Sequence, residues 1–289
     1  MNTTDEYWDI GGTSLQNYAW NITTEGGGRN STPSLRGDDV TVPFAPGQVF
    51  MRKVPDSREI TLRMWVQGSQ INGQPPTDRR TKQLFEKNLR ELRKLIWNPR
   101  KEVSLTKRFW VPTAELTAGG VSTGSLTKVG DYSLYSATAR AQMVGGFEYT
   151  MQGNSHATFE VDFKLADPYF YSEELSVSLV GGSRNLTVLG DDRTHAVTLE
   201  FVGPRAGITL RNNTLPVEFW YPGSIATGNT VVAKVKDFTA TSGATNVVGG
   251  VRHSGDSFWF PLEPGVNALS YSTTSGSGAT TLKYQPVWI

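Results

Sequence analysis

Residues 35–68 carry the clearest structural pattern of the chain and read LRGDDVTVPFAPGQVFMRKVPDSREITLRMWVQG. Its last part alternates apolar residues with polar or mixed ones, the apolar set being Ile60, Leu62, Met64 and Val66. Successive side chains of a β-strand point to opposite faces, so this alternation predicts a strand in a sheet with one buried face. Glycine and proline divide the stretch into short pieces, as expected of strands joined by turns.

The same pattern of short strands separated by turns covers most of the 289 residues. Its 30 glycines and 15 prolines separate short runs rich in Val, Thr, Phe, Tyr and Trp. The closing stretch, residues 264–289, reads PGVNALSYSTTSGSGATTLKYQPVWI. Its SGSG segment predicts a hairpin turn between its two strands, since glycine reaches positive φ at low cost. The further predicted strands are 103–110, 132–143, 157–165, 176–180, 196–201, 207–210, 230–235, 257–261, 268–273 and 280–287.

One segment departs from this rhythm. From Thr81 to Trp97 the apolar residues fall on one stripe of a 3.6-residue helix, namely Leu84, Phe85, Leu89, Leu92, Leu95 and Ile96. Thr77 or Asp78 is expected to cap the helix, which spans about 79–97, and Asn98 with Pro99 to end it. Its apolar stripe is expected to pack on the neighbouring sheet.

These elements predict a mainly β chain of two domains. Residues 1–172 read as an α+β domain with one amphipathic helix, and residues 173–289 as an all-β sandwich without a helical period. The boundary is placed at residues 165–174 (LADPYFYSEE), where a strand pattern ends in a proline-containing turn.

The composition narrows the classes of function. With 28 Lys+Arg and 27 Asp+Glu, the chain has almost no net charge that would attract nucleic acid or an anionic lipid surface. It has no cysteine, which excludes a thiolate site and is compatible with folding in a reducing compartment. The N-terminus lacks the apolar core of a signal peptide. Histidines 156, 195 and 253 lack metal-ligand spacing, and no nucleophile motif or phosphate-binding loop is present. We therefore expect no enzyme, metal site or cofactor.

Basic residues concentrate around the predicted helix. They are Arg79, Arg80, Lys82, Lys87, Arg90, Arg93, Lys94, Arg100, Lys101, Lys107 and Arg108, against Glu86, Glu91 and Glu102. Three uses stay open: a solvated helix face, a surface that docks on an acidic neighbour, or phosphate binding with Trp97 and Trp110 stacking on bases. For docking, the candidate residues are Arg52, Lys53, Arg79, Arg80, Lys87, Arg90, Arg93 and Lys94.

Aromatic clusters in the second half offer another binding hypothesis. Trp220, Tyr221 and Trp259 could form a platform for a sugar ring and give a carbohydrate-binding module for host adsorption. The alternative is that these aromatic residues pack in the core of the sandwich.

The order of residues across the chain also resembles a known family. Arg36-Gly37-Asp38-Asp39-Val40, Val42-Pro43, Arg58-Glu59-Ile60 and Met64-Trp65-Val66 resemble the belt domain of siphophage distal tail proteins, particularly of phages infecting actinobacteria. Residues 166–171 (ADPYFY) resemble the end of that domain. Residues 265–269 and 284–289 resemble the last strands of the family's galectin-like second domain.

This resemblance implies a structural protein of a long, non-contractile tail. It implies a belt-like first domain, a galectin-like second domain and a hexameric ring at the distal end of the tail tube. The implied partners are further copies of the chain, the tail tube protein, a tail hub or tail-associated lysin and other minor tail proteins. A membrane is not expected among the partners, and nucleic acid remains only the second alternative. The implied location is the tail tip of the virion, reached from the host cytoplasm during assembly.

Overall fold

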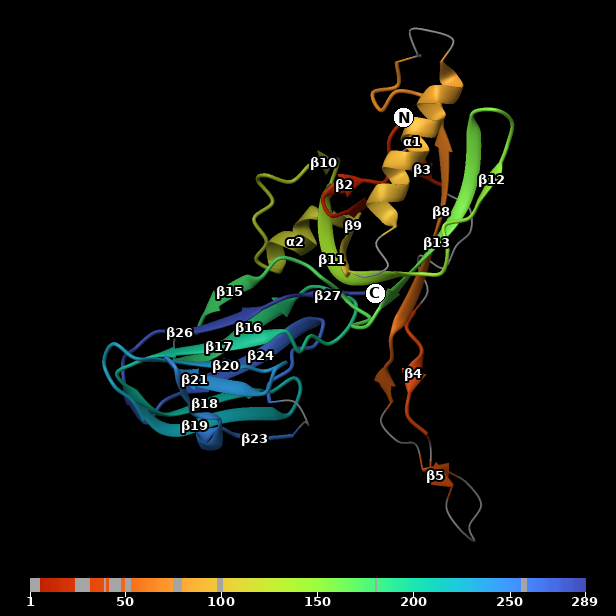
Figure 1. Cartoon of the computed structure of the whole chain (residues 1–289). Helices are drawn as coiled ribbons and strands as arrows, with labels where there is room; N and C mark the ends of the chain where they lie inside the picture. Colours follow the sequence, from red (N-terminus) through yellow and green to blue (C-terminus); the bar gives the residue numbers. More distant parts are fainter. Residues whose placement is uncertain are drawn as a thin grey trace. The chain divides into compact units, whose positions relative to one another are not determined.

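The computed structural model describes residues 6–23, 32–38, 40–41, 48–49, 53–74, 80–97, 101–179, 181–255 and 259–289. The chain is mainly β, as predicted, and divides into two compact units that we describe separately (Figure 1). The first unit comprises Met1–Trp110, Ser136–Phe170 and Ile289. The second comprises Val111–Tyr135 and Tyr171–Trp288, so it includes a segment from the middle of the chain.

The first unit contains a long antiparallel sheet in the order β2-β1-β9-β11-β13-β8-β3 and the helix α1. Its elements are β1 (Glu6–Ile10), β2 (Thr13–Ser14), β3 (Trp20–Ile22), β4 (Leu35–Arg36), β5 (Val40–Thr41), β6 (Gln48–Val49), β7 (Val54–Pro55), β8 (Arg58–Gln67), α1 (Thr81–Ile96), β9 (Val103–Pro112), β11 (Tyr132–Val144), β12 (Tyr149–Met151), β13 (His156–Leu165) and β14 (Phe170–Tyr171). Strands β9, β11 and β14 continue across the division between the units.

The alternation predicted for residues 60–66 is confirmed in β8. Ile60, Leu62, Met64 and Val66 are at most 1% exposed, and the residues between them face solvent. β13 pairs with β8 along its whole length, placing Phe163 opposite Ile60 and Phe159 opposite Met64. Directly opposed residues of an antiparallel pair lie on the same face, so the two strands bury one continuous apolar surface.

Helix α1 covers this apolar surface. Phe85, Leu92 and Ile96 are buried, and Asn88 donates hydrogen bonds to the carbonyl oxygens of Gln67 and Ser69, both at 2.8 Å. The predicted helix is therefore confirmed. The expected cap residues Thr77 and Asp78 and the stop at Asn98 and Pro99 lie outside the described residues. Arg80, at the N-cap position, makes no side-chain capping bond.

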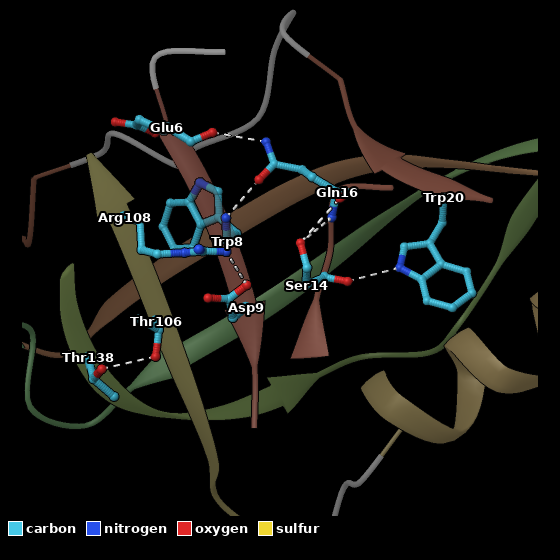
Figure 2. Close-up of polar contacts among 9 residues, drawn as sticks. All are labelled: Glu6, Trp8, Asp9, Ser14, Gln16, Trp20, Thr106, Arg108 and Thr138. Carbon is cyan, nitrogen blue, oxygen red and sulfur yellow. Dashed lines mark hydrogen bonds and ion pairs between the residues drawn. The ribbon is translucent and has the colours of Figure 1, made fainter. Parts of the chain in front are cut away.

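A polar network fastens the N-terminal strands of this unit (Figure 2). Gln16 accepts a hydrogen bond from the backbone N–H of Trp8 and donates one to the carbonyl of Glu6, each at 2.9 Å. The indole N–H of Trp20 donates to the carbonyl of Ser14 at 3.2 Å. These bonds satisfy polar groups beside Trp8, which is fully buried.

The second unit is a sandwich of two antiparallel sheets, ordered β15-β26-β17-β20-β21-β22 and β16-β24-β18-β19-β23. Its elements are α2 (Thr113–Ala118), β10 (Lys128–Val129), β15 (Leu175–Ser178), β16 (Gly182–Val188), β17 (Val197–Val202), β18 (Arg205–Asn212), β19 (Val217–Ile225), β20 (Thr230–Lys234), β21 (Thr239–Ser242), β22 (Thr245–Asn246), η1 (Val248–Gly250), β23 (Arg252–Ser254), β24 (Gly265–Ser272), β25 (Ser275–Gly276), β26 (Thr280–Tyr284) and β27 (Val287–Trp288). Phe201 of one sheet stacks on Phe219 of the other, with ring centroids 5.8 Å apart. The predicted β-sandwich is confirmed.

Three expectations of strand and helix position were wrong. The SGSG segment is no hairpin turn, because β24 pairs with β16 and β18 whereas β26 pairs with β15 and β17. It carries the chain from one sheet to the other and pairs with β18 on the way. The predicted strand 257–261 is also absent in its described part, since Trp259 and Phe260 form a bend. Helix α2 was not expected, because one and a half turns are too short to show a helical period.

Candidate assembly surface

Helix α1 presents a basic stripe to solvent. Its buried residues Phe85, Asn88, Leu92 and Ile96 follow the i, i+3, i+7 spacing of one helix face. Lys87, Arg90 and Lys94 follow the same spacing on the opposite face, and all three are exposed. We call these three residues the basic stripe. A helix with one apolar and one charged face is expected on a sheet surface, so burial of the first face places the second outward.

Six of the eight predicted docking residues lie in the part of the chain that the structure describes. Lys53, Arg80, Lys87, Arg90, Arg93 and Lys94 are exposed, and Arg52 and Arg79 lie outside the described residues. Arg93 is positioned by an aromatic contact, because its guanidinium carbon lies 5.3 Å from the ring centroid of Phe147. Phe147 in turn packs on Phe159 of the core at 4.8 Å. Arg93 is therefore positioned by an aromatic contact, and we do not count it in the basic stripe.

Two members of the basic cluster lie on β9 and pair with carboxylates of β1, so they do not belong to this surface. Lys107 is mostly buried and lies 3.1 Å from a carboxylate oxygen of Glu6. Arg108 pairs with Asp9 at 2.8 Å (Figure 2). Sequence proximity placed both in one cluster with the helix residues, but their ion pairs to β1 neutralise them.

The resemblance to a tail-protein family rested partly on Arg58 and on the ADPYFY run, and these residues meet in space. Arg58 is 2% exposed, with its guanidinium carbon 5.9 Å from the ring centroid of Phe170. Burial lowers the pKa of Arg58 from its ordinary value, and the Glu6 carboxylate opposes that shift. Phe170 also packs edge-on against Trp8 at 5.8 Å. The arrangement is that of a core contact.

An open groove lies on the other face of the same strands. It has a volume of about 680 Å³, and its polar lining includes Arg63, Glu148, Thr150, Gln152, Thr158 and Glu160. Arg63 donates a hydrogen bond to Glu160 across the β8–β13 pair. Met64 and Phe159 also border the groove, but their side chains are only 1% and 5% exposed. Because they alternate with the polar residues along the strands, the groove opens away from α1. This groove could not be predicted from the sequence, since it depends on how the strands pair.

The predicted glycan platform does not assemble into one exposed face. Trp220 is 37% exposed, but Tyr221 and Trp259 are buried at 8% and 6%. Trp220 and Tyr221 are neighbours in β19, so their side chains point to opposite faces of the sheet. Trp259 packs against Phe219 at 6.0 Å and Phe238 at 5.8 Å. Two of the three rings thus contribute to packing.

Other titratable groups of the second unit serve its core. Tyr284 is fully buried and donates to the carbonyl oxygen of Gly119 at 3.2 Å. Burial raises the pKa of Tyr284 to about 12. Burial likewise raises the pKa of Tyr135, whose ring packs edge-on against Trp288 at 6.0 Å. Both hydroxyls therefore stay protonated near neutral pH, as core tyrosines do.

The described residues hold no cluster of three or more His, Asp or Glu that could ligate a metal. Of the three histidines, His156 stacks on Trp65 with ring centroids 5.9 Å apart. Within the same part of the chain, neither α1 nor α2 is long and apolar enough to span a membrane.

Solved structures that match the chain over nearly its whole length include one crystal structure of a single protein. The chain resembles the crystal structure of SPP1 Dit (gp 19.1), described as a paradigm of the hub adsorption apparatus in phages infecting Gram-positive bacteria. The TM-score is 0.62 at 13% identity, over 99% of this chain and 100% of SPP1 Dit. Two structures of the phage p2 baseplate in its activated conformation, with Ca and with Sr, align over 97% and 96% of the chain at 8% and 9% identity. They cover 98% and 97% of those chains, with TM-scores of 0.39 and 0.34.

No protein-family model matches the sequence, and no curated protein matches it significantly. The likeness to SPP1 Dit is therefore one of structure and extends over both units. The chain has the fold of a phage distal tail protein.

Proposed function

We propose that this chain is a structural, non-catalytic protein of a siphophage tail tip. It forms a ring, hexameric as the sequence resemblance implies, at the distal end of the tail tube. The observation that carries this proposal is the end-to-end structural correspondence with SPP1 Dit. Low identity limits that correspondence to the fold. The belt-like pattern of residues 35–68 adds independent support from the sequence, since it resembles siphophage distal tail proteins, particularly those of phages infecting actinobacteria.

In this proposal residues 1–172 form the belt domain that makes the ring, and residues 173–289 form the galectin-like domain. Lys53, Arg80, Lys87, Arg90, Arg93 and Lys94 are the described residues of the assembly surface. The partners are the tail tube protein on one side and a tail hub or tail-associated lysin on the other. Exposed basic residues on a rigid helix suit this use, because charge complementarity sets partner choice and orientation.

The purified chain tests the ring directly. Its mass in solution, measured by light scattering alone and after mixing with its tail tube protein, should be a multiple of the 31.7 kDa protomer. Negative-stain images of the same sample should show closed rings. A strictly monomeric chain at high concentration, with no ring even beside the tail tube protein, would overturn the proposal.

A further inference from the structure

The basic stripe of α1 has cations that the helix itself does not neutralise. Lys87 has a carboxylate nearby, with its ammonium nitrogen 3.8 Å from Glu91, and that exposed pair is worth at most about 1 kcal/mol. Between Arg80 and Trp97 the described chain carries six basic and two acidic residues, whereas the whole chain is only +1. The rest of the protein therefore has more acidic than basic residues.

The groove on the opposite face of β8 and β13 carries charge opposite to that of the basic stripe. Its charged lining consists of Glu148, Glu160 and Arg63, so it carries one more negative than positive charge. Arg63 is bonded to Glu160, which leaves Glu148 as the carboxylate that faces the groove from the β12 side. Thr150, Gln152 and Thr158 add hydroxyl and amide groups that can accept hydrogen bonds from an ammonium or a guanidinium.

We propose that the basic stripe of one copy docks in this groove of a second copy. The inference rests on the proposed ring, for which it names the contact. The two surfaces also match in shape, because a helix is convex and the groove is concave. Trp97 lies just beyond the C-terminal end of the stripe. It is 43% exposed and supplies an apolar side chain at the same surface. The occupant is a second copy because stripe and groove belong to one chain and carry opposite charge.

The placement of the two surfaces determines the kind of assembly. The α1 helix lies on one face of the β8–β13 pair and the groove opens on the other, so the contact joins two different surfaces. Such a heterologous contact leaves a free stripe at one end and a free groove at the other. Repeating it gives a closed ring where the rotation closes, and an open filament where it does not. Charged contacts of this kind are exposed, so we expect the association to weaken with salt.

A charge exchange tests the proposal. Arg90→Glu places a negative charge on the stripe, and Glu148→Lys places a positive charge in the groove. Each variant should weaken self-association by at least about tenfold in sedimentation or mass-photometry titrations, a change of about 1.4 kcal/mol. The double variant Arg90→Glu/Glu148→Lys restores opposite charges and should recover most of the affinity. Raising the salt should weaken the wild type and the double variant alike.

Lys82→Glu is the matched control, since it makes the same change of net charge at an exposed helix residue off the stripe. It should leave self-association within about twofold of wild type. Circular dichroism and thermal unfolding of every variant establish that the fold persists, so that a lost contact is not a lost structure.

Four results would overturn the proposal. If Arg90→Glu and Lys82→Glu weaken assembly equally, net charge and not the stripe is responsible. Rings that form unchanged in both single variants would refute the stripe–groove contact and leave the proposed ring intact. Salt-sensitive retention of duplex DNA that Arg90→Glu abolishes, without any effect on self-association, would assign the stripe to nucleic acid. A wild type that stays monomeric beside its tail tube protein would refute the ring as well.

Discussion

Among single residues, Glu6 is a mostly buried carboxylate on which the stability of the first unit depends. Glu6 lies 3.1 Å from Lys107 and close to Arg58, and these three side chains are mostly buried. Removing one partner of a buried ion pair costs roughly 3–5 kcal/mol, because the remaining charge is left without compensation. Glu6→Gln should therefore lower the free energy of unfolding of the first unit by an amount in that range.

The measurement is urea unfolding followed by tryptophan fluorescence. Glu102→Gln is the matched control, because Glu102 lies 3.6 Å from Arg140 in a pair that is largely exposed. That change should cost under about 1 kcal/mol. Equal effects of the two substitutions would contradict the buried role of Glu6.

At the level of secondary structure, the connection between β24 and β26 takes the chain from one sheet of the sandwich to the other, and its backbone is constrained at one glycine. Gly276 has a φ of 92°, and a Cβ atom there would lie 2.1 Å from the carbonyl oxygen of Pro204. The residue thus meets both a backbone and a steric constraint. Gly228 has a similar φ of 83°, but no atom lies within 4 Å of its would-be Cβ.

Comparing alanine at these two glycines separates the two constraints. Gly228→Ala should cost about 1–2 kcal/mol from the left-handed backbone alone. Gly276→Ala should cost clearly more, because the Pro204 carbonyl or the strand pairing must shift. Thermal unfolding of both variants measures the difference. A Gly276→Ala variant as stable as Gly228→Ala would mean that this connection adapts freely.

The same elements show how far the sequence could be interpreted. Strand β8 and helix α1 were predictable because a period of 2 or 3.6 over many residues has one structural explanation. The SGSG segment was not, because glycine permits a turn without specifying whether the next strand returns to the same sheet. Of the candidate surface, sequence alone identified the helix residues. It could not separate Lys107 and Arg108 from them, nor predict the groove, since both depend on strand register.

At the scale of the whole molecule, the correspondence with SPP1 Dit extends over both units at a TM-score of 0.62 and only 13% identity. Burial patterns survive such divergence because many apolar side chains of similar volume fill the same core. Surface charges have no such constraint. The basic stripe is therefore a property to be tested in this chain and not one that the shared fold supplies.

The proposed function locates the chain at the tip of a phage tail. Immunogold labelling of virions that contain it, with antibodies raised against the purified chain, tests this location. We expect gold particles at the end of the tail farthest from the capsid. Labelling of the capsid, or labelling spread along the whole tail tube, would contradict it.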